Sequence, residues 1–276
     1  EIGLSTKSIW GGEQEHEPYE RSTQVPVVHS VSFGYKDIDT WHKAALGIVE
    51  GHIYSRNTNP TVRAFEDKVK ELENAEAATS FSSGMAAISN TLGTFLKSGD
   101  RVVSIKDSYG GTNVIFNEFL PPLNIDVSLC ETNDHEQIMT EIAKGCQVLY
   151  LETPTNPTIK ITDIKKLSAA AKEVGAIIVV DNTFATPINQ NPLALGADIV
   201  LHSASKYLGG HADALGGVIC GAKKLVEKVY HYREINGATL APMDAYSLLR
   251  GMKTLKLRVE RQNESAIIIA KHLQKH

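Results

Sequence analysis

Short apolar runs alternate with helix-like segments along most of this chain. Strand-like runs are predicted at Ala77–Phe81, Val102–Ile105, Asp126–Cys130, Gln147–Glu152, Ala176–Asp181, Asp198–His202 and Gly216–Cys220. Helices are predicted across and just before Asn90–Leu96, and at Asp134–Ala143, Thr162–Val174 and Lys223–Arg233. The strand runs are continuously apolar, which is typical of sheets covered by helices on both faces. The pattern predicts an α/β fold with a mostly parallel seven-stranded sheet and a site at the carboxyl ends of the strands.

The two ends of the chain differ from this central region. Residues 1–58 contain scattered polar, glycine and proline residues and few regular elements, so we expect an extended arm. Leu255–His276 has the pattern of one amphipathic helix. Its apolar positions need a partner surface that this chain does not contain: Leu257, Ile268, Ala270 and Leu273. We therefore expect three parts, an arm (1–58), an α/β domain (59–257) and the start of a truncated C-terminal domain (258–276).

The composition narrows the class of protein. The chain has 276 residues, 42% of them hydrophobic and 22% charged, which is ordinary for a soluble globular protein. A net charge of −4 favours neither nucleic acid nor a membrane surface as partner, and no apolar run approaches membrane-spanning length. No signal-peptide core is found at the N-terminus. Cys130, Cys146 and Cys220 lie in or beside apolar runs and are expected to be buried thiols, so we expect a cytoplasmic protein.

The most informative stretch is VLHSASKYLGGHAD, which starts at Val200. It places Lys206 just past a strand-like run, where a pocket can prepare a lysine for attack on a carbonyl carbon. Ser203 and Ser205 flank this lysine and could bind an anionic group, while the glycines that follow allow the backbone to approach a ligand. A surface lysine in a polar turn is the alternative. The buried run before Lys206 favours a functional lysine.

Asp181 ends another strongly apolar strand in AIIVVDNTFATP. A carboxylate at such a place is costly unless a cation pairs with it. A protonated pyridine nitrogen meets that need, and the ion pair keeps the ring protonated as an electron sink. The alternative is a helix N-cap after the strand, with Thr183 as a competitor. Together, Lys206 and Asp181 indicate a Schiff-base lysine and the acid that holds a pyridinium.

Three further strand-end loops carry candidate ligands. In SFSSGMAA, the backbone N–H groups of Gly84 and Met85 would suit a phosphate at a helix N-terminus, although a preceding serine could simply cap the helix. In DSYGGT, Tyr109 could stack on a planar cofactor and move a proton, or merely pack. In ETPTNP, Asn156 could donate to a ring hydroxyl, although the prolines alone explain a rigid turn.

The segment HIYSRNTNPT lies before the sheet region. Tyr54 and Arg56 within it suit a phosphate group. The alternative is a surface turn led by Asn59-Pro60. Local sequence alone favours this turn over a phosphate site.

Six motifs in order resemble the Cys/Met-metabolism enzymes that depend on pyridoxal 5′-phosphate (PLP): YSRNTNPT, SSGMAA, DSYGGT, ETPTNP, VVDNTFATP and SASKYLGGHAD. The family includes cystathionine γ-lyase, cystathionine γ-synthase, methionine γ-lyase and O-acetylhomoserine sulfhydrylase. The resemblance extends from the arm to Leu255. It implies fold type I, the aspartate-aminotransferase type, and a homotetramer built from tight dimers. PLP is the implied cofactor, no metal is implied, and the substrate is an amino acid.

The resemblance also assigns roles at matching positions. Lys206 matches the Schiff-base lysine, Asp181 the partner of the pyridine nitrogen, and Tyr109 the tyrosine that stacks on the ring and assists the leaving group. Asn156 matches a residue near the ring hydroxyl. The remaining matches concern the phosphate: Gly84, Met85, Ser203 and Ser205 in the same subunit, and Tyr54 and Arg56 from a neighbouring subunit. The family often has threonine at the position of Ser205, and the hydroxyl is kept.

Two departures from the family pattern affect the expected activity. Family members carry the arginine that binds the substrate carboxylate in a C-terminal domain, and neither Arg250, Arg258 nor Arg261 matches it. Gly111 stands where methionine γ-lyases usually carry cysteine, and the surrounding loop differs from cystathionine β-lyases. We therefore expect a cystathionine γ-lyase or γ-synthase, with O-acetylhomoserine sulfhydrylase or methionine γ-lyase as alternatives. A non-catalytic PLP-binding fragment is the alternative of another class.

Two unrelated enzyme classes fit less well. A nucleotide-binding oxidoreductase would need a G-x-G-x-x-G loop after the first strand, and the chain has none there. A metalloenzyme could use His202, His211 and the cysteines, but their spacing fits no zinc site. We expect both histidines to be structural or to line the cofactor loop.

Overall fold

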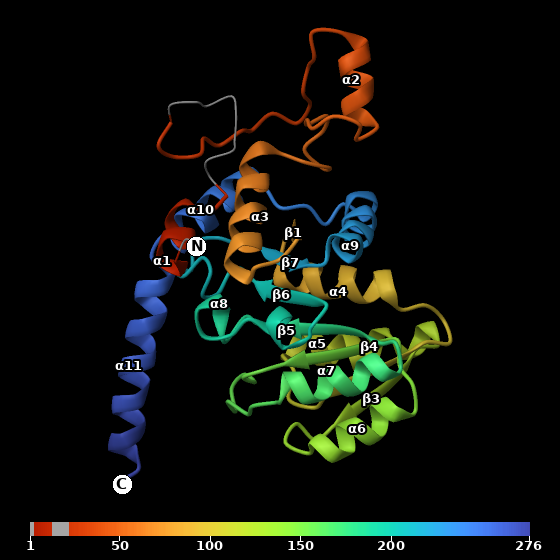
Figure 1. Cartoon of the computed structure of the whole chain (residues 1–276), viewed down its shortest axis with the longest axis vertical. Helices are drawn as coiled ribbons and strands as arrows, with labels where there is room; N and C mark the ends of the chain where they lie inside the picture. Colours follow the sequence, from red (N-terminus) through yellow and green to blue (C-terminus); the bar gives the residue numbers. More distant parts are fainter. Residues whose placement is uncertain (1–2, 13–21) are drawn as a thin grey trace.

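The computed structural model describes residues 3–12 and 22–276. Its centre is a seven-stranded sheet in the order β1-β7-β6-β5-β4-β2-β3, in which β7 alone runs antiparallel to its neighbours (Figure 1). The strands are β1 (Ala77–Phe81), β2 (Arg101–Ile105), β3 (Asp126–Cys130), β4 (Val148–Glu152), β5 (Ile177–Asp181), β6 (Ile199–Ser203) and β7 (Gly217–Gly221). Each strand lies within one residue of its prediction, and the mostly parallel sheet is confirmed.

Helices surround the sheet. The α-helices are α1 (Leu4–Trp10), α2 (Ile38–Ala45), α3 (Pro60–Glu73), α4 (Gly84–Phe95), α5 (Gly110–Val114), α6 (His135–Ala143), α7 (Ile164–Glu173), α8 (Thr186–Asn189), α9 (Lys223–Asn236), α10 (Pro242–Met252) and α11 (Leu255–Leu273). Many begin at a local capping residue: Asn59 accepts the Thr61 N–H at 3.0 Å before α3, and Asp134 accepts the Gln137 N–H at 2.8 Å before α6. These caps satisfy backbone donors that the helix itself leaves free.

The sheet separates two apolar layers. Along β4, Val148 and Tyr150 pack with α4 and α9 on one face, while Leu149 and Leu151 pack with α6 and α7 on the other. All four side chains are fully buried. The helices α3 and α10 extend the second layer over β6 and β7. Burial on both faces explains the continuous apolar runs in the sequence.

The expectation that the first 58 residues form an arm with few regular elements is wrong for two segments. Helix α1 forms and packs on α3, and Ser8 within it is buried. Helix α2 forms because Asp37 accepts the Thr40 N–H at 2.7 Å, and it lies far from the sheet (Figure 1). Its Ile38 side chain is 72% exposed. Residues 13–21 of the predicted arm lie outside the described residues.

The last helix, α11, confirms the predicted amphipathic element. Leu255 and Val259 near its start are buried, whereas Leu257, Ile268 and Leu273 are exposed. Figure 1 shows the helix running away from the sheet. The three cysteines are buried free thiols, as predicted. Within the described residues, no helix is both long enough and apolar enough to cross a membrane.

Candidate active site

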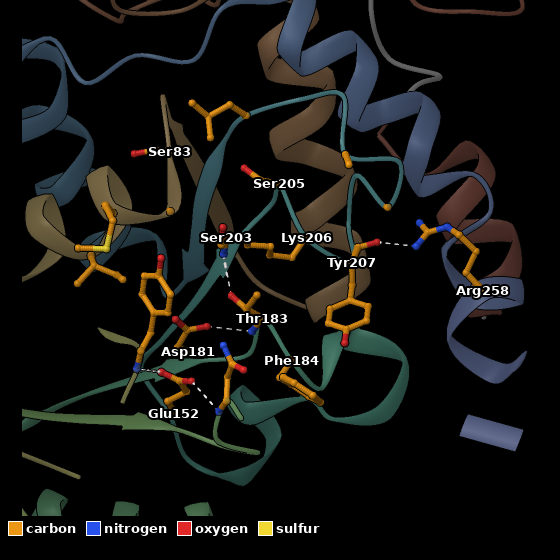
Figure 2. Close-up of a pocket in the computed structure, with 18 of the residues that line it drawn as sticks. Ser83, Glu152, Asp181, Thr183, Phe184, Ser203, Ser205, Lys206, Tyr207 and Arg258 are labelled. Carbon is orange, nitrogen blue, oxygen red and sulfur yellow. Dashed lines mark hydrogen bonds between the residues drawn. The ribbon is translucent and has the colours of Figure 1, made fainter. Parts of the chain in front are cut away.

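A cavity of about 690 Å³ opens where the strands β1, β2, β4, β5 and β6 end (Figure 2). Its lining brings together most of the predicted site residues: Gly84, Met85, Tyr109, Asn156, Asp181, Ser203, Ser205 and Lys206. The segments that carry them are far apart in the sequence. The parallel strands place their carboxyl ends at one edge, which is why these loops converge. The predicted position of the site is thus the position of the cavity.

Lys206 lies in the turn that follows β6. Its backbone N–H donates to the Ser203 carbonyl at 3.1 Å, and its own carbonyl accepts the Gly210 N–H at 2.7 Å. The side chain is exposed to the cavity. Arg258 of α11, which also lines the cavity, donates to the carbonyl of Tyr207 at 2.8 Å and holds the same turn (Figure 2). The turn therefore presents the Lys206 amine on a fixed backbone.

Asp181 ends β5 and is only 6% exposed. Its carboxylate accepts the Thr183 N–H at 2.9 Å and the Tyr150 hydroxyl at 3.3 Å, both neutral donors. Burial raises the pKa of Asp181, and the hydrogen bonds from Thr183 only partly offset this. The helix-cap alternative is wrong, because α8 begins at Thr186 and Ala185 precedes it. A buried carboxylate with neutral partners fits a cationic ring nitrogen in the cavity.

The start of α4 forms a cradle for an anion. Ser83 accepts the Ala86 N–H at 3.1 Å, so the predicted serine cap exists. It satisfies only that donor, and the cap is therefore compatible with anion binding by the N–H groups of Gly84 and Met85 at the cavity. A Cβ atom at residue 84 would lie 2.6 Å from the Ser203 Cβ, so glycine is required for this close approach. Free N–H groups at a helix N-terminus suit an anion such as a phosphate group.

The two serines beside Lys206 are held differently. The Ser203 backbone N–H donates to the Thr183 hydroxyl at 2.8 Å, which ties β6 to the loop that carries Asp181 (Figure 2). The Ser205 hydroxyl accepts the Gly216 N–H at 2.9 Å and donates its own proton to the Gly216 carbonyl at 3.3 Å. To bind an anion, the Ser205 hydroxyl must therefore turn its proton away from that carbonyl. Ser203 and Ser205 both line the cavity.

The sequence reasoning missed Glu152 as a site residue. Its carboxylate accepts the Tyr109 N–H at 2.6 Å and the Asn156 N–H at 3.3 Å (Figure 2). In the β4–β5 register it lies opposite Asp181. Burial, followed by the Asp181 charge, raises the pKa of Glu152 to about 7. The signal was present, because Glu152 ends an apolar strand as Asp181 does. Thr183, which joins Asp181 to Ser203, was also weighed only as a cap.

Tyr54 and Arg56 do not line this cavity. Both are exposed, and the Arg56 guanidinium carbon lies 5.0 Å from the centre of the Tyr54 ring. A backbone bridge joins Tyr54 to Ser32, another residue of the arm. The structure therefore leaves their predicted role in a neighbouring subunit as a prediction.

The two histidines considered as metal ligands have other partners. His202 is buried and hydrogen-bonds the Glu73 carboxylate at 2.6 Å, while a His211 ring nitrogen lies 2.8 Å from the Gly209 carbonyl. Across residues 3–12 and 22–276, no group of three or more histidine, cysteine or acidic side chains could hold a metal ion. The structural interpretation of His202 is thereby supported.

Comparison with known proteins identifies the family. The model of the Cys/Met metabolism PLP-dependent enzyme family matches residues 5–276. Cystathionine gamma-lyase of Bacillus subtilis (strain 168) is 44% identical over 248 residues, which are 90% of this chain and 65% of that protein. L-methionine gamma-lyase of Fusobacterium nucleatum subsp. nucleatum is 38% identical over 99% of this chain and 70% of that protein.

The crystal structure of metB from Corynebacterium glutamicum agrees with the fold prediction. It superposes with a TM-score of 0.93 at 35% identity, over 100% of this chain and 70% of that chain. The chain thus spans about two thirds of the length of these relatives. The predicted fold type I architecture is confirmed. Because the family model spans residues 5–276 and these relatives are at least 35% identical, the chain belongs to the Cys/Met metabolism PLP-dependent enzyme family.

Proposed function

We propose that this chain forms the PLP-binding part of an enzyme that performs γ-elimination or γ-replacement on a sulfur-containing or homoserine-derived amino acid. The observation that carries this proposal is the meeting of Lys206 and Asp181 in one cavity beside a helix N-terminus. An amine, a buried carboxylate and an anion cradle are the three features that a phosphorylated pyridine aldehyde requires. The family assignment supports the same cofactor.

The proposed ligands of PLP divide between its two charged ends. The N–H groups of Gly84 and Met85 and the hydroxyls of Ser203 and Ser205 would hold the phosphate. Asp181, whose pKa burial raises, would accept a hydrogen bond from the ring nitrogen and keep that nitrogen protonated. Asn156 also lines the cavity and would donate to the ring hydroxyl.

The chemistry follows from these positions. When bound, PLP supplies an electron sink for negative charge on the substrate α-carbon. Lys206 would hold PLP through its Nζ, and the same amine, when free, would take the α-proton of the substrate. Tyr109 moves a proton at the phenol oxygen, to or from the γ-substituent as it leaves or is replaced. Lys206 and Tyr109 each lie only a few residues after the end of a strand, and this fixed backbone orients the two proton transfers.

Two observations support a cystathionine γ-lyase or γ-synthase activity. The Bacillus subtilis relative carries the name cystathionine gamma-lyase and is 44% identical. Residue 111 is a glycine, packed beside the flexible end of Met85, where methionine γ-lyases usually carry cysteine. Methionine γ-lyase, O-acetylhomoserine sulfhydrylase and a non-catalytic PLP-binding fragment remain the alternatives.

We also propose that the enzyme is a homodimer or homotetramer with shared active sites. Tyr54 and Arg56 are exposed and lie away from the cavity of their own chain, as a contribution to another subunit requires. The arm (1–58), the α/β domain (59–257) and the start of a C-terminal domain (258–276) are the proposed parts. Three buried thiols support a reducing compartment, the cytoplasm.

The test is the covalent link at Lys206. Borohydride reduction of the PLP-loaded protein should fix the cofactor to the wild-type chain and to the control Lys166→Ala, whose side chain pairs with Glu136 on the surface. The Lys206→Ala variant should bind PLP without covalent fixation. Cofactor fixed to Lys206→Ala would overturn the assignment. Release of a 2-oxo acid and ammonia from cystathionine then separates an active enzyme from a non-catalytic fragment.

A further inference from the structure

Glu152 occupies an unusual place beside the cavity. Its side chain is 5% exposed, yet both carboxylate oxygens have backbone partners rather than a lysine or arginine. One oxygen accepts the Tyr109 N–H at 2.6 Å, and the other accepts the Asn156 N–H at 3.3 Å. These donors belong to the loops after β2 and β4, so a single carboxylate joins two separate walls of the cavity.

The strand register explains why Glu152 reaches both loops. It ends β4, which lies between β2 on one side and β5 on the other. The loop after β2 passes over the end of β4, and Tyr109 directly precedes α5 there. No side chain caps α5, and the Tyr109 backbone N–H is bonded to Glu152 instead. The backbone that carries the Tyr109 ring is therefore held by this carboxylate.

Holding a carboxylate here is energetically unfavourable in the absence of a ligand. Asp181 lies opposite in the register, and burial together with that neighbouring charge raises the pKa of Glu152 to about 7. A neutral side chain would avoid this cost but could not accept two N–H bonds with equal strength, because a carboxamide offers one oxygen. The bidentate acceptor explains why a carboxylate stands at this position.

We propose that Glu152 is a positioning residue, whose carboxylate fixes the backbone of Tyr109 and Asn156 and so sets where the Tyr109 phenol lies over the cavity. This inference rests on the proposed function only for the role of the phenol; the bridge itself concerns the chain alone. Glu152 acts through Tyr109 and does not touch the reacting atoms.

The first test measures the bridge without any cofactor. Hydrogen exchange followed by mass spectrometry on the full PLP-free chain should show about tenfold faster exchange in Glu152→Ala, in segments 107–114 and 153–158 only. Glu152→Gln should retain protection in one of these two segments. The control Glu136→Ala removes an exposed carboxylate, with a side chain 80% accessible, and should change neither. Unchanged exchange at both loops in Glu152→Ala would overturn the proposal. Should this variant unfold globally, unchanged exchange in Glu152→Gln would overturn it.

The second test asks whether Glu152 acts through Tyr109. In the PLP-loaded enzyme, Glu152→Gln should lower kcat about tenfold and change KM less than twofold, since the substrate-binding groups are untouched. In a Tyr109→Phe background, the same change should cost less than about twofold, because the phenol it positions is already absent. Losses that multiply in the double variant would overturn action through Tyr109. An enzyme that never forms the Lys206 link would refute the proposed function, and the exchange result would still decide the bridge.

Discussion

The carboxyl edge of the sheet and the N-terminal arm both carry residues of the family motifs, but the chain holds them in different ways. At the sheet edge, Asp181 and Glu152 are buried and each accepts two hydrogen bonds. On the arm, Arg56 is exposed and stacks on the exposed Tyr54. The edge gathers its site residues around one cavity within a single chain. The arm presents two exposed side chains, for which we propose a role in the site of a neighbouring subunit.

This difference follows from where each region obtains its stability. The strands are packed in a core on both faces of the sheet. The loops at their ends are therefore held in fixed positions. Helix α2 of the arm has an N-cap but leaves Ile38 and most of its other apolar side chains exposed. Substitutions at the edge should consequently affect chemistry in each chain separately, whereas substitutions on the arm should affect it between chains.

The largest effect is expected for Asp181→Asn. The substitution keeps the shape but removes the charge that holds the ring nitrogen protonated, and losses of buried charge partners cost about 3–5 kcal/mol. We expect kcat to fall by about 10²–10⁴-fold, with PLP still bound. Steady-state kinetics and absorbance of the bound cofactor measure this. Near-normal turnover would show that the electron sink does not depend on Asp181.

Arg56→Ala tests the proposed role of the N-terminal arm, as distinct from that of the sheet edge. We expect weaker PLP binding by about 10–100-fold, from loss of a charge-assisted contact, and an unchanged unfolding temperature because Arg56 is exposed. Titration with PLP and thermal unfolding measure these effects.

Mixing subunits tests the shared site directly. Hybrids of Arg56→Ala with Lys206→Ala subunits should regain one site in which both residues are intact, although each parent is impaired. If hybrids form but recover no activity, Arg56 serves the site of its own chain.

The pH dependence of stability should distinguish Glu152 from exposed carboxylates. Its pKa of about 7 in the folded chain lies above the ordinary value of 4.5, so the folded state holds this proton more tightly than the unfolded state. The stability contributed by the protonated carboxyl is therefore complete below pH 4.5 and is lost as the pH rises through 7. As the pH rises over this range, we expect the free energy of unfolding of the PLP-free wild type to fall by up to about 3 kcal/mol relative to that of Glu152→Gln.

Urea unfolding at a series of pH values measures this effect. Glu136→Gln is the control. Its carboxylate is exposed, so the pH profile of this variant should match that of the wild type. Bound PLP should reduce the effect, because a cation beside Asp181 stabilises both carboxylates. Parallel pH profiles for the PLP-free wild type and Glu152→Gln would contradict the raised pKa.

The smallest effect is expected for Ser83→Ala. This substitution removes the cap of α4, whose side chain accepts the Ala86 N–H at 3.1 Å. N-caps contribute about 1 kcal/mol, so we expect the unfolding temperature to drop by about 2–4 °C. PLP affinity should change little, since Gly84 and Met85 supply the proposed N–H donors. A large loss of PLP affinity at unchanged stability would make Ser83 a phosphate ligand in its own right.

Much of the site could be predicted from the sequence because its signals are local. An apolar run that ends in Asp181, or that leads into Ser203 and Lys206, reports burial followed by a loop, and that pattern marks the edge of a parallel sheet. The same reasoning placed all seven strands within one residue. The sequence reasoning did not predict helix α2. This short helix begins at the Asp37 cap and has no continuous buried face that an apolar pattern would reveal.

The sequence by itself determined which residues are buried, where each strand ends and which side chains stand at those ends. Only the tertiary structure decided which of these ends are neighbours, because strand order and register arise from contacts between segments far apart in the chain. The bond from Tyr109 to Glu152 spans 43 residues, and the link from Ser203 to Thr183 spans 20. A hydrogen bond depends on distances of a few tenths of an ångström, and local hydrophobic periodicity carries no information at that scale.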